Sequence, residues 1–446
     1  MKRLIAQQLL DWKSHPRRKP LILEGVRQCG KTHSLESFGQ SAFANAHIFN
    51  FESQQDDLHD IFNADFNPRR IIDELSFYQH KPINIHEDVL IFDELQACPR
   101  AITSLKYFCE KMPEMAVCAA GSLLGLKLND ASFPVGKVDM LSLHPLSFIE
   151  FLWALGDNQS AELIQACTLD STIAPVVHAH IWERLKWYFI TGGLPEAIQV
   201  FCEHRDNLYV AFEKVREKQH QLIKAYYADI AKHAGKENAM HIERVWSSVP
   251  KQLANIQNST SQRFQFTGII PGIDRYQRLV GSIDWLTAAN LVHKTSITSH
   301  VEHPISAFCK ENLFKLYVCD VGLLGAMTDL PPQAILNYDY GTYKGYFAEN
   351  FVAQELKTAG LRQLICWQQS RSEIEFLFAQ GADIIPLEVK AGHIQKAKSL
   401  KKYVDLYHPP HHVILSAQTL NIDRGSGLHQ YPLYLASQLP IIYSQS

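Results

Sequence analysis

The spacing of hydrophobic residues changes several times along the chain, and the changes divide it into segments. From about Leu21 to Glu150, short apolar runs ("LILEGV", "AHIFNF", "DVLIFDE" and "AVCAAGS") alternate with stretches of helical spacing. Apolar strands that alternate with helices are typical of a parallel sheet flanked by helices. We therefore predict an α/β core over residues 1–150, which opens with an amphipathic helix that ends before Pro16.

The middle of the chain has mainly helical spacing. From about Phe151 to Ala234 this spacing is interrupted at "TGGLPEA", which predicts a helical region over residues 151–235. Two further helical stretches, "HIERVWSSVPKQLANI" and "DRYQRLVGSIDWLTAANL", precede the alternating run "VHKTSITS". Two helices followed by strands are the outline of a winged helix, which we predict over residues 236–332.

The last segment combines helices and strands. A helical stretch, "GYFAENFVAQELKTAG", precedes three apolar runs, "QLICWQQ", "SEIEFLFAQ" and "IIPLEVKAG". A basic helical stretch, "IQKAKSLKKYVDLY", and a final run, "HVILSA", follow. This order predicts a separate α/β domain over residues 333–446.

Composition limits the kinds of function that the chain can have. A chain of 446 residues is too long for one core, and 46% hydrophobic with 20% charged residues is typical of globular domains. Nine scattered cysteines without a CxxC pair favour neither a disulfide framework nor a zinc cluster, so we expect a cytoplasmic protein. No apolar run approaches the length of a membrane span, so we expect no membrane partner.

A formal net charge of −3 means that nucleic acid would have to bind to local basic patches. Two helical stretches offer such patches. Arg275 and Arg278 share one helix face, and a second group follows near the C-terminus: Lys396, Lys398, Lys401 and Lys402. The lysine group could equally be an ordinary solvated helix face, and the winged helix that carries the arginines can also bind protein.

A phosphate-binding loop follows the first apolar run. The segment "GVRQCGKT" matches GxxxxGK[ST], and it lies between an apolar strand and a helical stretch, as the motif requires. The glycines let backbone N–H groups point at phosphate oxygens, the lysine reaches the β- and γ-phosphates, and the threonine holds Mg²⁺. The predicted ATP-binding residues are Gly25, Val26, Arg27, Gln28, Cys29, Gly30, Lys31 and Thr32.

A pair of carboxylates ends the run "DVLIFDELQ". Asp93 would complete the Mg²⁺ site with Thr32, and Glu94 would act as the general base for the attacking water. Both carboxylates could instead cap the next helix. Ser122, at the end of "AVCAAGS", is a weaker candidate for sensing the γ-phosphate.

Several segments together resemble a group of bacterial and archaeal AAA-type ATPases, close to the STAND-like clade. They run in family order: "GVRQCGKT", "IFDELQACP", "AAGSLLG", "LSLHPLSFIEFL", "GGLPEAI", "YYADI", "FKLYVCDVGLL" and "IPLEVKAG". The group carries a C-terminal domain of unknown function related to PD-(D/E)xK nucleases. The resemblance implies an ATPase core, a helical lid whose Pro195 contacts the nucleotide base, a winged-helix-like domain and a restriction-endonuclease-like C-terminal domain.

One departure from this group concerns oligomerisation. Where its members usually read "GR", this chain has Gly136 and Lys137. If this basic residue reaches the γ-phosphate of a neighbouring copy, Lys137 would contribute to the active site of a homo-oligomer. A lysine makes only a monodentate contact with phosphate, whereas an arginine can make a bidentate one.

The nuclease-like site needs carboxylates from a helix and two strands, with a lysine two residues after the last carboxylate. Glu349, Glu375, Glu388 and Lys390 occur in this order, and Glu375 and Glu388 would hold the metal. Glu375 stands where the resembling proteins usually have Asp, and its extra methylene would shift a metal of strict geometry. The alternative is a nuclease-like fold with an inactive pocket.

The sequence therefore predicts a multidomain α/β, Mg²⁺-dependent ATPase that couples its nucleotide state to nucleic-acid binding. DNA is favoured over RNA, and phosphodiester cleavage is a second possible activity. One alternative is an ATP-gated signalling or scaffold switch whose C-terminal domain is inactive and binds protein. Another is an ATPase that remodels proteins.

Overall fold

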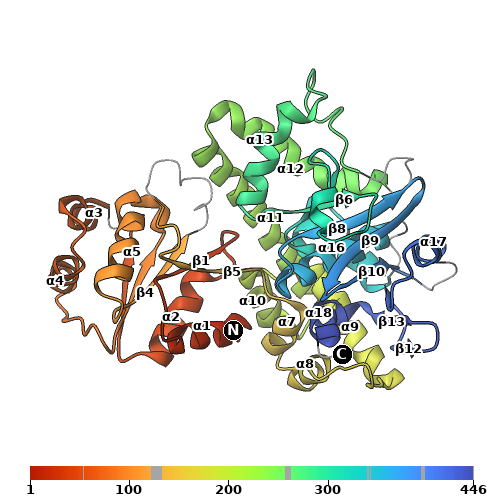
Figure 1. Cartoon of the computed structure of the whole chain (residues 1–446), viewed down its shortest axis with the longest axis horizontal. Coiled ribbons are helices and arrows are strands. Elements are labelled where there is room, and N and C mark those ends of the chain that lie inside the picture. The colour runs from red at the N-terminus through yellow and green to blue at the C-terminus, as the bar shows by residue number, and fades with distance from the viewer. Residues whose placement is uncertain are drawn as a thin grey trace. The chain divides into compact units, whose positions relative to one another are not determined.

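The computed structural model describes residues 1–53, 55–121, 133–256, 263–338, 341, 343–392 and 397–444 (Figure 1). It divides into two compact units, an N-terminal unit, Lys2–His144, and a C-terminal unit that begins at Pro145. None of the helices within the described residues has both the length and the apolar character needed to cross a membrane.

The N-terminal unit contains a five-stranded parallel sheet in the order β2-β3-β4-β1-β5. Its strands are β1 (Leu21–Gly25), β2 (Ala46–Asn50), β3 (Val89–Asp93), β4 (Ala116–Gly121) and β5 (Asp139–Leu143). Every strand is followed by its connection at the same edge, so the carboxyl ends of β1, β2 and β3 meet there. The predicted parallel-sheet core is therefore confirmed.

Helices accompany this sheet in the same unit. They are α1 (Ile5–Ser14), α2 (Lys31–Ala42), α3 (Gln55–Ala64), α4 (Pro68–Tyr78) and α5 (Pro99–Lys111), with a short 3₁₀ helix at Leu95–Ala97. The helix α1 ends before Pro16, as its amphipathic spacing predicted.

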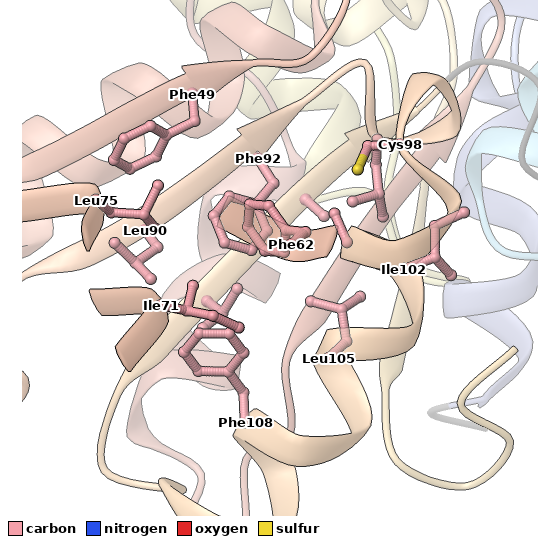
Figure 2. Close-up of a cluster of buried hydrophobic side chains, with 14 of the residues drawn as sticks. Phe49, Phe62, Ile71, Leu75, Leu90, Phe92, Cys98, Ile102, Leu105 and Phe108 are labelled. Atoms are coloured by element: carbon pink, nitrogen blue, oxygen red, sulfur yellow. The ribbon is translucent and has the colours of Figure 1, made fainter. Parts of the chain in front are cut away.

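A cluster of aromatic and aliphatic side chains joins the sheet to α3, α4 and α5 (Figure 2). Phe62 and Phe92 lie edge to face with ring centroids 5.6 Å apart, and Phe108 packs against Phe92 at 6.4 Å. Close packing of this kind leaves little freedom for a strand to shift. The cluster therefore fixes β3, whose last residue is Asp93.

The C-terminal unit begins with helices. They are α7 (Phe148–Leu155), α8 (Asn158–Gln165), α9 (Pro175–Thr191), α10 (Pro195–His204), α11 (Leu208–Ala234), α12 (Lys236–Ile256) and α13 (Tyr276–Ala288). A capping box starts α7, because the Ser147 hydroxyl accepts from the Glu150 N–H and the Glu150 carboxylate accepts from the Ser147 N–H. The helical spacing from Phe151 to Ala234 thus predicted the secondary structure correctly.

An eight-stranded mixed sheet completes this unit, in the order β12-β13-β11-β10-β9-β8-β6-β7. Its strands are β6 (Val292–Thr298), β7 (Phe314–Val318), β8 (Leu364–Gln369), β9 (Ser372–Gln380), β10 (Asp383–Val389), β11 (His412–Ser416), β12 (Asn421–Asp423) and β13 (Leu428–Pro432). The strand pair predicted for the winged helix, β6 and β7, forms one edge of this sheet, and β6 pairs in parallel with β8. Residues 236–332 and 333–446 therefore share one sheet, and their division into two domains stays a prediction.

Further helices complete the C-terminal unit. They are α14 (Val321–Met327), α15 (Pro332–Leu336), α16 (Tyr343–Thr358), α17 (Lys398–Tyr407) and α18 (Leu439–Ser444), with 3₁₀ helices at Ile305–Phe308 and Leu433–Gln438. Of these, α16 packs against the edge strand β7 and the interior strands β8 and β10, so it crosses several strands of the sheet.

Candidate functional site

The phosphate-binding loop leaves β1 at Gly25 and enters α2 at Lys31. Gly25 has a φ of 154°, and a Cβ atom there would lie 2.1 Å from the carbonyl oxygen of Leu143. Only glycine fits this close approach of the loop to β5. Cys29 is fully buried, and its Sγ donates to the same Leu143 carbonyl at 3.4 Å, which favours a packing role for this thiol.

Lys31 is the first residue of α2, and its side chain is buried. Its ammonium donates to the carbonyl oxygens of Gly25 and Val26, each at 3.0 Å. The N-terminus of α2 adds partial positive charge to the same loop. The loop therefore combines a lysine held by neutral oxygens with a helix end that favours anions.

The predicted Mg²⁺ ligands Thr32 and Asp93 lie side by side. The Thr32 hydroxyl donates to Asp93 Oδ1 at 2.9 Å, and the Asn50 amide donates to Asp93 Oδ2 at 3.0 Å. A hydroxyl next to a carboxylate offers the hard oxygen ligands that Mg²⁺ prefers, so these residues fit the ion.

Asn50 is a part of this site that the sequence did not single out. It is the last residue of β2 and pairs in register with Asp93, the last residue of β3. Two polar residues at the ends of neighbouring parallel strands were the available signal.

Glu94, the predicted general base, follows β3 directly and is half-buried. Its φ of 50° is uncommon for a residue other than glycine, and such backbone strain concentrates at functional sites. The Gln96 side chain donates to Glu94 Oε2 and so orients the carboxylate. Ser122 lies outside the described residues. The strand β4, which lies between β3 and β1 in the sheet, ends at Gly121, one residue before it.

Lys137 forms an ion pair within its own unit. Its ammonium lies 2.9 Å from Glu110 Oε1, and both side chains are exposed to solvent. The hydrogen bond that Lys137 donates to the Glu110 carboxylate raises the pKa of Lys137. The role of this residue between neighbouring copies stays a prediction.

Pro195, the predicted base contact, is the first residue of α10 in the C-terminal unit. The loop before it is held by its own unit, because the Gly193 N–H donates to Asp320 Oδ2 at 2.5 Å and the Leu146 N–H donates to the Gly193 carbonyl at 2.6 Å. A Cβ atom at Gly193 would lie 2.1 Å from Leu146 O. The "GGLPEAI", "LSLHPLSF" and "CDVGLL" segments thus meet in one buried junction, where burial raises the pKa of Asp320 to about 6.

The predicted nuclease residues form one cluster of charged side chains in the C-terminal unit, called the acidic pocket below. Glu375 Oε2 accepts from the Val389 N–H at 2.9 Å, and Glu388 Oε1 lies 2.6 Å from the Lys390 ammonium. Burial raises the pKa of Glu375 to about 8, against the opposing effect of Lys390. Glu349, on α16, interacts electrostatically with both Glu375 and Lys390.

A second lysine reaches this pocket from β7. Lys315 is 1% exposed, and its ammonium lies 3.4 Å from Glu349 Oε2 and also forms a salt bridge with Glu373 Oε1. The Tyr317 hydroxyl donates to the same Glu349 oxygen at 2.9 Å. Sequence reasoning missed Lys315 and Glu373, and the signal was a lysine inside the otherwise apolar run "FKLYV".

The acidic pocket fits a divalent metal poorly. One observation favours a metal, since Glu388 Oε2 is buried and has no hydrogen-bond partner. Against it, Glu349 and Glu375 already accept hydrogen bonds from protein groups. Within the described part of the chain, no group of three His, Cys, Asp or Glu residues is arranged to hold a metal ion.

The candidate nucleic-acid contacts lie on two helices. Arg275 and Arg278 are exposed at the start of α13, and Lys398 and Lys401 are exposed on α17. Lys402 is half-buried and donates to the Gln369 carbonyl at 3.3 Å. Lys396 lies outside the described residues.

Three family models match parts of the chain. Residues 17–152 match an AAA domain, residues 183–334 match a domain of unknown function (DUF8612), and residues 344–436 match another domain of unknown function (DUF4143). No curated protein matches the chain.

Similar solved structures have low sequence identity. The Walker-type ATPase PABY2304 of Pyrococcus abyssi is 14% identical, with a TM-score of 0.45, over 73% of this chain and 95% of that one. The Aeropyrum pernix Orc1 protein, solved in complex with DNA, is 13% identical, with a TM-score of 0.27, over 74% and 92%. AMPPCP-bound DnaA from Aquifex aeolicus is 13% identical, with a TM-score of 0.28, over 64% and 86%.

The AAA match covers the parallel sheet, the phosphate loop and the residues at the ends of β2 and β3. Residues 17–152 therefore resemble an AAA domain, with the parallel sheet and phosphate loop of a P-loop ATPase core.

Proposed function

We propose that the protein binds and hydrolyses ATP with Mg²⁺ and that its nucleotide state controls binding of nucleic acid. The observation that carries the first part is the junction of Lys31, Thr32 and Asp93 at the carboxyl edge of the parallel sheet. This junction supports the proposal, because a bound triphosphate needs a cation for its oxygens and a hydroxyl and a carboxylate for its Mg²⁺.

Each residue has a distinct task in this proposal. Lys31 exchanges its two carbonyl partners for oxygens of the β- and γ-phosphates, which bind the ammonium more strongly because they are charged. Thr32 and Asp93 would hold Mg²⁺, which neutralises phosphate charge when it is bound. Glu94, oriented by Gln96, accepts a proton from the attacking water.

The substitution Glu94→Gln tests hydrolysis apart from binding. It keeps the shape of the side chain and removes the base, so we expect the hydrolysis rate to fall about 100-fold while ATP affinity stays within about threefold. Glu114→Gln, at an exposed position of the same unit, is the matched control. A Glu94→Gln protein that hydrolyses ATP at the wild-type rate would remove Glu94 from the mechanism.

The coupling to nucleic acid rests on exposed basic residues, and we favour DNA over RNA. Binding of a labelled DNA duplex is measured with ATP and with ADP over a range of salt concentrations. Phosphate contacts predict that affinity falls steeply with salt, and that replacing Arg275 and Arg278 by alanine reduces the slope by about two. Arg362→Ala, at an exposed position, is the control. Equal DNA affinity with either nucleotide would refute the coupling.

A second candidate function is an ATP-gated scaffold in which the C-terminal pocket is inactive and its domain binds protein. The salt bridges of Lys315 to Glu349 and Glu373 favour it, because Glu349 is one of the candidate nuclease carboxylates and is already paired with an ammonium. The rival activity is phosphodiester cleavage by Glu349, Glu375, Glu388 and Lys390. Plasmid nicking with Mg²⁺ or Mn²⁺ that Lys390→Ala abolishes, with ATP hydrolysis retained, would establish cleavage. No nicking in any nucleotide state supports the scaffold.

A further inference from the structure

We propose that the Lys315 ammonium is the resident cation of the acidic pocket, and that it excludes divalent metal from the pocket of the native protein. The inference does not depend on ATP hydrolysis by the N-terminal unit. In this proposal Lys315, on the edge strand β7, supplies the positive charge that a bound metal ion supplies in an active nuclease.

The geometry of Lys315 supports this assignment. The residue lies in the middle of β7, all of whose residues are buried, so its ammonium has no path to solvent along its own strand. It contacts Glu349 from the helix α16 and Glu373 from the strand β9. One cation therefore bridges carboxylates of two separate elements, which is also what a metal ion does in a site of this kind.

Both ammonium groups of the pocket already have carboxylate partners. Lys315 is paired with Glu349 and Glu373, and Lys390 is paired with Glu388. Three of the four carboxyl groups therefore already have a cation beside them without a metal.

An ammonium also makes different demands from a metal. It donates three hydrogen bonds from one atom, whereas Mg²⁺ requires six oxygen ligands at about 2.0–2.1 Å. A metal ion that took Glu349 as a ligand would have to displace Lys315 from it. Because β7 is buried throughout, the displaced ammonium would lose its counter-ion without reaching solvent along its strand, so exchange is disfavoured.

Removal of Lys315 should convert the pocket into a metal site. Glu349 and Glu373 then lose their salt bridge to Lys315, and Glu388 Oε2 already lacks a hydrogen-bond partner. Lys315→Met keeps the length and apolar stem of the side chain and removes its charge. Lys315→Arg is the matched control, because it keeps a cation at the same position.

Mn²⁺ binding to the nucleotide-free protein, measured by electron paramagnetic resonance, tests the proposal. All variants carry Asp93→Asn, so that the predicted metal ligand of the N-terminal unit does not contribute. We expect the protein with Lys315 or Arg at this position to bind no Mn²⁺ beyond the background of exposed carboxylates. We expect Lys315→Met to bind about one further ion, at least about tenfold more tightly than that background.

Several results would overturn the proposal. One is a tight Mn²⁺ site in the protein that retains Lys315 and disappears when Glu388→Gln is added. Another is a folded Lys315→Met protein that gains no Mn²⁺ site. If Lys315→Met is too unstable to purify, Lys315→Gln replaces it in the same measurement, and the result for the native lysine still decides whether metal is excluded.

Discussion

Two buried lysines, one in each unit, show opposite uses of the same side chain. Lys31 donates to two backbone carbonyl oxygens of the phosphate loop, whereas Lys315 forms salt bridges with two carboxylates of the acidic pocket. Carbonyl oxygens are neutral and compete weakly with phosphate, so Lys31 is available to an anionic ligand. Carboxylates already neutralise Lys315, so its charge is committed to the fold. The partners of a buried cation, more than its burial, therefore indicate whether it serves a ligand.

The largest effect should come from removing the committed cation. Lys315→Ala leaves the buried Glu373 and the half-buried Glu349 without this counter-ion, and breaking a buried ion pair typically costs about 3–5 kcal/mol of stability. Chemical denaturation followed through the C-terminal tryptophans, among them the buried Trp367, measures the change. Lys310→Ala, exposed in the same unit, should change stability by less than about 0.5 kcal/mol. Equal stabilities for the two variants would mean that the carboxylates need no lysine.

Removal of the available cation should affect the ligand and spare the fold. We expect Lys31→Ala to weaken ATP binding about 100-fold, which corresponds to about 2.7 kcal/mol, because a buried charge-assisted contact to phosphate is lost. Titration with a fluorescent ATP analogue measures the affinity, and Lys106→Ala at an exposed position is the control. If Lys31→Ala lowered the free energy of unfolding as much as Lys315→Ala does, both lysines would stabilise the fold and the proposed difference between them would be wrong.

Glu355 is a buried carboxyl group that, unlike Glu349 and Glu373, forms no salt bridge with Lys315. Glu355 is fully buried on α16, accepts from the Phe148 N–H at 3.0 Å, and has its pKa raised to about 8 by burial. Between pH 4.5 and 8 the folded protein therefore keeps a proton that the unfolded chain releases, so this group lowers stability as pH rises through that window.

The substitution Glu355→Gln removes that proton equilibrium. From pH 5 to pH 8 the free energy of unfolding of the variant should fall by about 1–3 kcal/mol less than that of the wild type, because glutamine cannot ionise. Thermal unfolding at both pH values gives the comparison, with the exposed Glu162→Gln as control. A variant whose pH dependence equals that of the wild type would show that Glu355 ionises normally in the fold.

The smallest effect concerns the support of the magnesium ligand. Asn50→Ala removes one hydrogen bond to Asp93, so we expect the apparent affinity for Mg²⁺ in ATP hydrolysis to fall about three- to tenfold. The control is Asn63→Ala on the exposed face of α3. An unchanged Mg²⁺ dependence would limit Asn50 to a role in packing.

The sequence predicted the N-terminal site better than the C-terminal one for a physical reason. The phosphate loop is contiguous, and Asp93 ends a fully apolar strand, so local patterns were sufficient. Asn50 needed only the rule that parallel strands end at one edge. The structure then brought Thr32, Asn50 and Asp93 within hydrogen-bonding distance.

The acidic pocket depends on strand pairing that no local pattern encodes. Glu375, Glu388 and Lys390 were found because they lie on neighbouring strands that follow one another in the chain. Lys315 was missed because its strand was assigned to a winged helix, and only the parallel pairing of β6 with β8 brings it to the pocket. The lysine within "FKLYV" indicates that a carboxylate must lie near this strand. The local sequence does not indicate which carboxylate it is.

The position of Lys315 on β7 also affects how the C-terminal unit can be assembled. Its partner Glu373 comes 58 residues later in the chain, and the hairpin of β6 and β7 can join the rest of the sheet only after β8 has been made. Such non-local contacts slow folding, because the chain must lose the entropy of closing a long loop before the contacts can form. A fragment of residues 333–446 would leave the ribosome with Glu349 and Glu373 but without their cation, so we expect it to aggregate where the longer segment from Pro145 onward folds.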